Sequence, residues 1–421
     1  MRDRRRWIEW GKDALIVLLT LSAAYLLSVT PLVRDSGVLD LLAPQESPGA
    51  GAAAGGAAAA MLPARLAITG AGGRCGIQYD EKRLEEQFPP LGALLGDALA
   101  SAGRPQPLEE ARWRRLLGGK GIYFDFLGDV PLSALERWLQ GPEGGALDGS
   151  ARRVLLCAGE GDQVLLCWQE SDSGSFFSSS TALTQTLHLD PATESAVPNG
   201  AYFAFESPVL EDRLAPYTLV TEGGAEGACY AASLPLAGEA QKAAVLEALS
   251  FTGPNHAPVS GGEVYPDGGD RLVVYDNGTV AYRAVHGGKY PVEPGPAGGV
   301  DGARTLAERT LGALCGEARL YLMSAKETEN GLRVRFGYLL DGSAVYLGGE
   351  GWAAEFWVRD GYIVQFTLHF RSYTAGGERA LLLPIDKAAA MLPDYTPERR
   401  ELVVQYRDGG GTEVSPDWVA V

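Results

Sequence analysis

Residues 271–283 read RLVVYDNGTVAYR and form the clearest local structural signal in the chain. Two runs of aliphatic and aromatic residues flank Asp276-Asn277-Gly278. Asn-Gly between such runs favours a type I′ hairpin, because both central residues of that turn adopt positive φ. Two further strand-like pairs turn at Asp341-Gly342 and at Asp360-Gly361. Closely turned neighbouring strands predict antiparallel sheets.

Helical patterns are interspersed with these strands. The apolar spacing and the positions of acidic and basic residues predict helices over residues 81–88, 91–102, 108–117, 132–139, 238–249, 303–315 and 385–391. Meanders of strands accompanied by one or two helices predict an α+β architecture, with antiparallel sheets that carry their helices on one face.

Changes in composition divide the chain into segments. A pure Gly/Ala run at residues 49–60 has no side chains to pack, so it predicts a flexible tether. A serine-rich stretch near residue 175 and a Pro/Gly-rich stretch at residues 290–300 suggest later boundaries. We therefore expect a basic tail (1–13), a transmembrane helix (14–33), a Gly/Ala/Pro-rich tether (34–61) and three α+β domains (62–180, 181–297 and 298–421).

The segment from Ala14 to Val33 has no charged side chain and is long enough to cross a bilayer core of about 30 Å as a helix. Five cationic residues precede it, so the positive-inside rule predicts a cytoplasmic N-terminus and an extracytoplasmic C-terminal bulk. The alternative is a cleaved signal peptide, but the apolar run is long for one and lacks a clear Ala-x-Ala site. We expect an uncleaved single-pass anchor in the cell membrane.

The charge of the chain excludes one class of partner. The net charge is −17, the first 13 residues contribute +2 and residues 14–33 contribute none, so residues 34–421 carry −19. A surface this acidic repels phosphate backbones, and we therefore expect no nucleic-acid binding.

The five cysteines are too widely spaced for a disulfide-built fold, and we expect buried free thiols. Cys157 and Cys167 lie on two runs that turn at Glu160-Gly161. A two-residue turn there pairs Cys157 with Val164, so the two sulfurs are not expected to face each other.

Motifs for catalysis and metal binding are absent from the sequence. Its four histidines show no H-x-x-x-H spacing, no G-x-S-x-G elbow occurs, and no calcium loop is present. We therefore expect no enzyme activity, no catalytic or cofactor-binding residues, no metal site and no cofactor. One interaction site is expected in the membrane: Thr20, Ala24 and Ser28 share a helix face, where small residues let two transmembrane helices approach closely.

Several short segments resemble the YycH/YycI family of Gram-positive regulators. They are IYFDF (122–126) followed by Pro131 and a short helix, LEALSF (246–251), Asp267-Gly268 before the hairpin at residues 271–283, LLPIDKAAA (382–390) and VSPDW (414–418). The last two resemble YycI and related PepSY-like modules. The basic tail, the single span and the large α+β region match the family's layout, whereas the Gly/Ala tether departs from it.

The resemblance implies a regulator without catalysis that binds a WalK-like sensor histidine kinase, together with a sibling regulator, and tunes cell-wall two-component signalling. Two other classes stay open on the residues alone. One is an anchored hydrolase of cell-wall polymers or peptides, and the other is a PepSY-like protease inhibitor or chaperone module.

Overall fold

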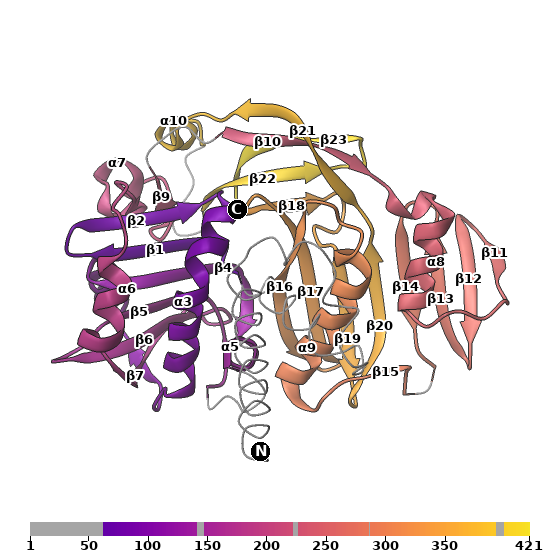
Figure 1. Ribbon diagram of the computed structural model, residues 1–421, viewed down its shortest axis with the longest axis horizontal. Coiled ribbons are helices and arrows are strands. Elements are labelled where there is room, and N and C mark those ends of the chain that lie inside the picture. Colours follow the sequence, from indigo (N-terminus) through magenta and orange to yellow (C-terminus); the bar gives the residue numbers. More distant parts are fainter. Residues whose placement is uncertain (1–61, 141–146, 222–225, 286, 393–399) are drawn as a thin grey trace, which may run out of the picture. The chain divides into compact units, whose positions relative to one another are not determined.

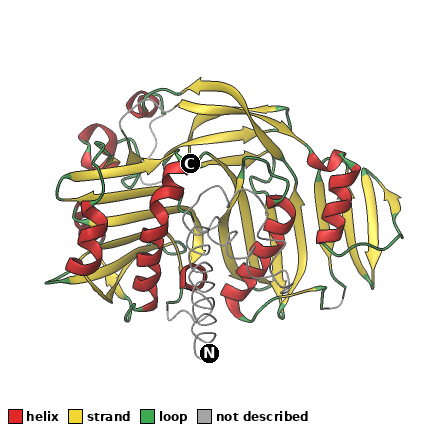
Figure 2. Cartoon of the chain, viewed as in Figure 1, coloured by secondary structure: helices red, strands yellow, loops and turns green. Residues whose placement is uncertain are grey.

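The computed structural model describes residues 62–140, 147–221, 226–285, 287–392 and 400–421, all of which belong to one compact unit, Ala53–Val421. The fold is α+β with large antiparallel sheets, as predicted (Figures 1 and 2). Across these ranges no helix is both long and apolar enough to cross a membrane. The predicted span 14–33 and the tether 34–61 lie outside the described residues.

The first sheet is built from β1 (Arg65–Gly70), β2 (Gly73–Gln78), β3 (Gln106–Leu108), β4 (Gly121–Pro131), β5 (Ser150–Ala158), β6 (Gln163–Glu170) and β7 (Phe176–Thr184). Its order is β2-β1-β4-β5-β6-β7-β3, and all neighbours are antiparallel. Alternate residues point to opposite faces. Ile122 and Phe124 therefore join one apolar cluster and Tyr123 another, so both faces of this sheet are buried.

Helices cover both faces of the first sheet, so the prediction that helices lie on one face is wrong for this sheet. The cluster of Ile122 and Phe124 includes α3 (Glu81–Ala100) and α5 (Leu132–Gln140), and the cluster of Tyr123 includes α4 (Glu110–Gly118). The prediction of two helices before and after Pro89-Pro90 is wrong, because α3 continues through both prolines. Each proline removes one backbone hydrogen bond, but the carbonyls that lose it belong to Glu85 and Glu86 on the exposed side. Burial of the leucines on the other side outweighs that loss.

The second sheet contains β11 (Ala257–Val259), β12 (Gly262–Asp267), β13 (Asp270–Tyr275), β14 (Thr279–Arg283), β15 (Tyr290–Pro291), β16 (Arg319–Thr328), β17 (Gly331–Leu340), β19 (Ala354–Arg359) and β20 (Tyr362–His369). Eight of these run antiparallel in the order β11-β12-β13-β14-β20-β19-β17-β16, and β15 extends the β14 side of β20. The sheet crosses the predicted boundary at residues 297/298, since β14 pairs with β20. The predicted domain limits stay predictions.

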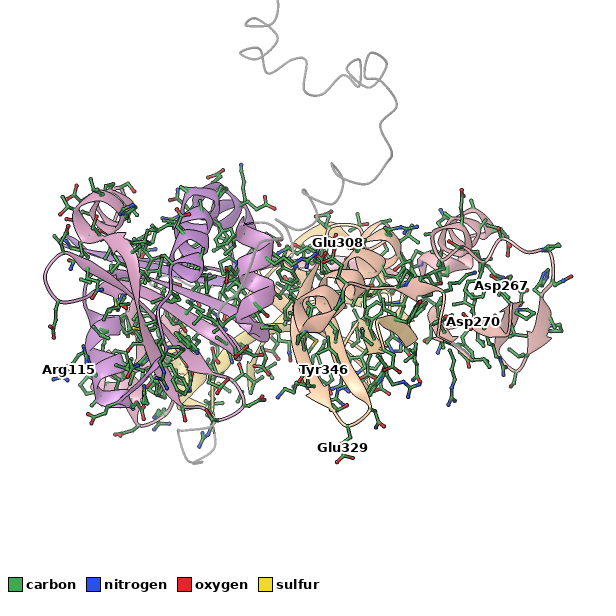
Figure 3. All side chains as sticks on the ribbon, turned by 90° about the horizontal axis from the view of Figure 1, so that it is seen from below. Arg115, Asp267, Asp270, Glu308, Glu329 and Tyr346 are labelled. Carbon is green, nitrogen blue, oxygen red and sulfur yellow. The ribbon has the colours of Figure 1, made fainter. Side chains whose placement is uncertain are left out.

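One face of the second sheet is covered by α8 (Glu239–Ala248) and α9 (Gly295–Ala307). Val245 of α8 and Val300 of α9 pack in the same apolar cluster as Val274 and Val334 of the sheet. Figure 3 shows Glu308, which directly follows α9, at the upper edge of this part of the molecule. Glu329, at the β16–β17 turn, lies at its lower edge. Here the helices do lie on one face, as predicted.

The remaining elements connect and extend these sheets. A parallel pair joins β18 (Ser343–Leu347) to β22 (Leu402–Asp408), which continues to β24 (Pro416–Ala420). Two small sheets are β21 (Ser372–Leu381), β10 (Glu226–Ser233) and β23 (Glu413–Val414), and β8 (Tyr202–Phe203) with β9 (Leu219–Val220). The short helices are α6 (Asp190–Glu194), α7 (Pro208–Glu211) and α10 (Ile385–Ala390), with 3₁₀ turns at Ala204–Glu206 and Pro235–Ala237 and π turns at Gln185–Leu189 and Glu308–Gly312.

The two large sheets meet where β4 passes β16. Asp129 forms a parallel bridge with Ser324, and a Cβ at Gly128 would lie 1.9 Å from the carbonyl oxygen of Leu322. Only glycine permits so close a backbone approach. The preceding residue, Leu127, has a φ of 60°, and it lies where the pairing of β4 with β5 is interrupted.

The hairpin at residues 271–283 is confirmed, but its predicted turn type is wrong. β13 ends at Tyr275 and β14 begins at Thr279, which leaves a three-residue loop in which only Gly278 has positive φ (81°). Such a loop is a type I turn closed by one left-handed residue. The Asp-Gly turns do have two positive φ values, 49° and 74° at Asp341-Gly342 and 52° and 77° at Asp360-Gly361.

All five cysteines are buried free thiols, as predicted. The predicted register of the cysteine hairpin is wrong by one residue, because its loop contains Asp162 in addition to Glu160 and Gly161. Cys157 pairs with Leu165 rather than Val164, and Cys167 pairs with Leu155. This shift places both sulfurs on one face of the sheet, 3.9 Å apart.

Candidate functional site

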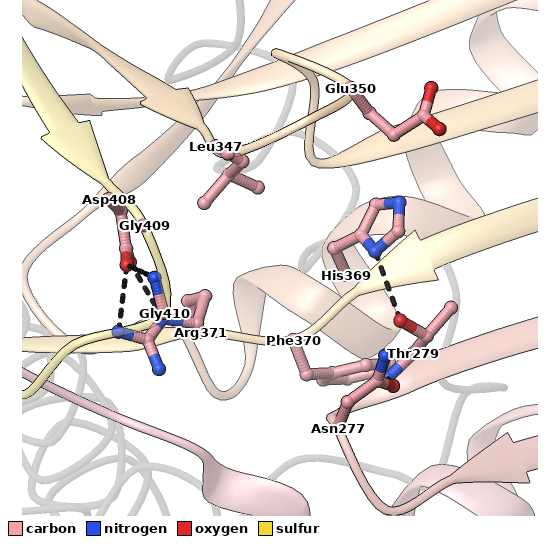
Figure 4. A pocket seen from close by; sticks show the side chains of 11 residues that line it. Asn277, Thr279, Leu347, Glu350, His369, Phe370, Arg371, Asp408, Gly409 and Gly410 are labelled. Carbon is pink, nitrogen blue, oxygen red and sulfur yellow. Dashed lines mark hydrogen bonds and ion pairs between the residues drawn. The ribbon is translucent and has the colours of Figure 1, made fainter. Parts of the chain in front are cut away.

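A cavity of about 280 Å³ opens where four strands of the second half of the chain end (Figure 4). It is lined by residues from the β13–β14 turn, the end of β18, the end of β20 and the end of β22. The lining residues are Asn277, Thr279, Leu347, Gly348, Glu350, His369, Phe370, Arg371, Asp408, Gly409 and Gly410.

His369 is a polar residue of this cavity with an unused hydrogen-bonding position. Its Nδ1 lies 3.2 Å from Thr279 Oγ1, whereas its Nε2 is buried and has no hydrogen-bond partner within the described ranges. Figure 4 shows Nε2 on the side of the ring away from Thr279, toward the part of the cavity where Glu350 lies. The Trp352 ring packs against the imidazole, with centroids 4.8 Å apart.

The environment keeps this imidazole neutral. Burial lowers the pKa of His369 from its ordinary 6.5, and the negative charge of Glu350 only partly opposes that shift. A neutral ring has one donor and one acceptor nitrogen. Nε2 can therefore make one further hydrogen bond to a small polar group that enters the cavity.

The wall of the cavity opposite His369 is formed by an ion pair between Arg371 and Asp408. Arg371 donates to Asp408 through Nε (2.7 Å) and Nη2 (2.9 Å), and Tyr373 donates its hydroxyl to the same carboxylate at 2.8 Å. The Gly410 amide also donates to Asp408, at 2.8 Å. Because the two charges neutralise each other, this wall fixes the loop after β22 and contributes no net charge to the cavity.

A second cluster of charged groups joins the first sheet to the start of β22. Glu401, just before β22, contacts Arg65 of β1, and it accepts hydrogen bonds from Arg152 (2.6 Å) and Arg153 (3.0 Å) of β5. Asp125 of β4 accepts hydrogen bonds from Arg152 at 3.0 and 3.2 Å. We call these five residues the arginine cluster.

The arginine cluster carries net charge +1 and is buried except at Arg152, whose side chain is 25% exposed. Arg65, Asp125 and Glu401 have exposed fractions of 2%, 0% and 4%. Burial alone would raise the pKa of Glu401 and of Asp125, but Arg152, Arg65 and Arg153 together hold the pKa of Glu401 well below its usual range and lower that of Asp125. Both carboxyls are therefore ionised at neutral pH, and the cluster fixes the C-terminal strands against the first sheet.

A third polar contact lies between α3 and the second sheet. The backbone N–H of Glu81 donates to Asp341 at 3.2 Å, and the Glu81 side chain contacts Arg319. Burial raises the pKa of Glu81 and of Asp341. The start of α3 is thus connected to the second sheet by polar contacts.

The residues predicted to form a membrane interaction face, Thr20, Ala24 and Ser28, lie outside the described residues, so that site stays a prediction. Among the residues that are described, no group of three or more His, Cys, Asp and Glu could hold a metal ion. Sequence reasoning missed the His369 cavity and the arginine cluster. Their members lie up to 336 positions apart and show no local motif.

No protein-family model matches this sequence, and no curated protein matches it either. A solved structure does: the crystal structure of YycH from Bacillus subtilis aligns with a TM-score of 0.54 at 10% sequence identity, over 86% of this chain and 94% of that one. The chain has a YycH-like fold. Because the match covers most of both chains, the likeness extends beyond a single module. The match confirms the fold that the sequence resemblance implied.

A second solved structure, an uncharacterized protein from Eubacterium rectale, aligns with a TM-score of 0.28 at 11% identity, over 48% of this chain and 78% of that one. This TM-score is too low to establish a shared fold. The assignment of a YycH-like fold therefore rests on the comparison with YycH.

Proposed function

We propose that this chain is a non-catalytic, membrane-anchored extracytoplasmic regulator that binds a WalK-like sensor histidine kinase and modulates cell-envelope two-component signalling. The observation that carries the proposal is the YycH-like fold over 86% of the chain. At 10% identity this likeness concerns the fold, so the kinase, and a sibling regulator as a second partner, belong to the proposal.

The location is part of the same proposal. Residues 14–33 anchor the chain, the N-terminus lies in the cytoplasm and the folded body lies outside. Protease added to intact cells should digest the folded body and spare the N-terminal tail. A body that stays protected, or a mature N-terminus downstream of Val33, would remove this part of the proposal.

The Thr279–His369 contact is the feature closest to catalytic machinery. A serine-type hydrolase needs a hydroxyl activated by a histidine that a third group, usually a carboxylate, orients. Here the ring nitrogen on the Glu350 side has no hydrogen-bond partner among the described residues, so none of their carboxylates orients His369 through it. This geometry argues against serine-type hydrolysis in this cavity.

Co-purification tests the partner. The tagged full chain should retain the WalK-like kinase when membranes are solubilised in a mild non-ionic detergent. An unrelated single-pass protein with the same tag serves as control. Equal recovery of the kinase on both baits, or recovery on neither, would exclude a direct complex.

A further inference from the structure

The face of the second sheet opposite α8 and α9 carries exposed and partly exposed polar side chains. Strand register places one residue from each of six strands side by side in a line across this face. We call this line the basic row. In order across β16, β17, β19, β20, β14 and β13, it consists of Lys326, Arg333, Trp357, Gln365, Arg283 and Arg271.

The neighbouring line of residues on the same face carries little compensating charge. It consists of Ser324, Arg335, Glu355, Thr367, Ala281 and Val273. Its only carboxylate, Glu355, pairs with Arg335 at 2.6 Å. The two lines together hold five cations and one anion, a local charge of +4 in a chain whose net charge is −17.

Three arginines of the basic row lack a carboxylate partner. Within the described ranges Arg271, Arg283 and Arg333 form no ion pair, and Arg271 and Arg283 are exposed. The guanidinium carbon of Arg333 lies 5.7 Å from the centre of the Trp357 ring. Lys326 is already paired, with Asp172 at 3.1 Å and Asp129 at 3.5 Å.

Arg271 and Arg283 lie directly opposite each other on adjacent antiparallel strands. Like charges at such positions destabilise a sheet. Neither residue has a carboxylate partner among the described residues, so their mutual repulsion destabilises the unbound protein. An incoming anion would relieve this repulsion. Arginine also has a planar fork of donors that suits carboxylates.

The apolar content of this face indicates which of two partners, an acidic protein or a membrane, it is suited to bind. Membrane-binding faces insert exposed apolar side chains into the headgroup layer. In these two lines Val273 is buried and Trp357 is partly buried, with its Nε1 donating to Glu355 at 3.2 Å. Gln365 lies between Trp357 and Arg283 in the basic row, and Thr367 lies beside Glu355 in the neighbouring line, so both can offer hydrogen bonds to a polypeptide.

The spacing of the row fits an extended chain. Three strand steps separate Arg333 from Arg283, which is about 14 Å at roughly 4.8 Å a step. In an extended peptide, side chains four residues apart on one face are separated by about the same distance, at roughly 3.4 Å a residue.

We propose that the basic row is a docking surface for an acidic, extended segment of a partner protein. The carboxylates of that segment pair with Arg271, Arg283 and Arg333. The inference goes beyond the proposed function, since it holds whether or not the partner is a kinase.

The test uses the full chain in phosphatidylcholine nanodiscs and a fluorescein-labelled peptide of alternating Glu and Ser, with binding followed by fluorescence anisotropy. Exchanging Arg271→Gln and Arg283→Gln together should weaken binding about fivefold, and added salt should weaken it further. The matched control exchanges Arg115→Gln and Arg213→Gln, two exposed arginines outside this face, and should change affinity less than about twofold. A peptide of alternating Gln and Ser should not bind.

Three results would overturn the docking surface. They are native affinity in the Arg271/Arg283 variant, an equal loss in the control variant, and equal binding of the Gln peptide. Vesicles that contain phosphatidylglycerol form a separate arm. If they bind through Arg271 and Arg283 while the Glu peptide does not, the face is a membrane site and the protein-docking proposal is wrong. None of these results depends on the kinase, so failure here leaves the proposed function standing.

Discussion

Arg65 and Glu401, 336 positions apart in the sequence, form an ion pair in which both side chains are at most 5% exposed. Arg65 belongs to the first strand of the fold, and Glu401 precedes the last long one. The pair therefore joins the two ends of the described body. Arg152, Arg153 and Asp125 complete the surrounding arginine cluster.

Loss of the Glu401 charge should destabilise the body. Glu401→Gln leaves the buried Arg65 and Arg153 and the partly exposed Arg152 with one carboxylate, and breaking a buried pair in this way costs about 3–5 kcal/mol. The free energy of unfolding, measured by urea titration of the full chain in detergent, should fall by about that amount. The exposed Glu378→Gln is the control and should stay within about 0.5 kcal/mol of the native chain. Equal stabilities of the two variants would show that the cluster contributes nothing.

The same cluster should make the body acid-sensitive. The folded pKa values of Glu401 and Asp125 lie below their ordinary values of 4.5 and 3.8. Their contribution is therefore fully present above pH 4.5 and is lost as the pH falls through the folded values. Glu81 and Asp341, whose pKa values are raised, act in the opposite direction, so the comparison must isolate Glu401. The stability difference between the native chain and Glu401→Gln should shrink steadily below pH 4.5, and a constant difference would refute the assignment.

His369 offers a spectroscopic prediction. Burial lowers its pKa, and Glu350 raises it by a smaller amount. The Cε1–H resonance of His369 should titrate below 6.5, and Glu350→Gln should move the midpoint lower still. An NMR titration of the ¹³C-histidine-labelled chain measures both values. A midpoint above 6.5, or an upward shift in the variant, would contradict the geometry of the cavity.

The membrane face is testable through association. Thr20, Ala24 and Ser28 are predicted to contact another transmembrane helix, so Ala24→Leu should weaken association with the kinase in a membrane two-hybrid assay at least severalfold. Leu19→Ile, elsewhere on the same segment, is the control. If Ala24→Leu associates as strongly as the control, this face makes no contact.

Sequence reasoning succeeds where structure is local. The hairpin at residues 271–283 and the Asp-Gly turns lie where they were predicted, because a few adjacent residues decide a turn. The failures follow from interactions that a single segment does not show. Burial by leucines carries α3 through Pro89-Pro90, and one extra loop residue brings Cys157 and Cys167 together.

The sites depend on pairings between distant segments. Thr279 meets His369 only because β14 and β20 are neighbours, and Arg271 faces Arg283 only once the strand register is set. The net charge of −17 does not predict that basic side chains line up on one face of the second sheet. Charge sums describe a whole chain, whereas binding depends on one face of it.

The central claim is that this chain regulates a sensor kinase from outside the membrane. Its most direct test is the phosphorylated fraction of the kinase's response regulator in cells that contain or lack the chain, measured on phosphate-affinity gels. We predict that deletion changes this fraction, and that the full chain restores it whereas a chain without residues 14–33 does not. An unchanged fraction after deletion would contradict the claim.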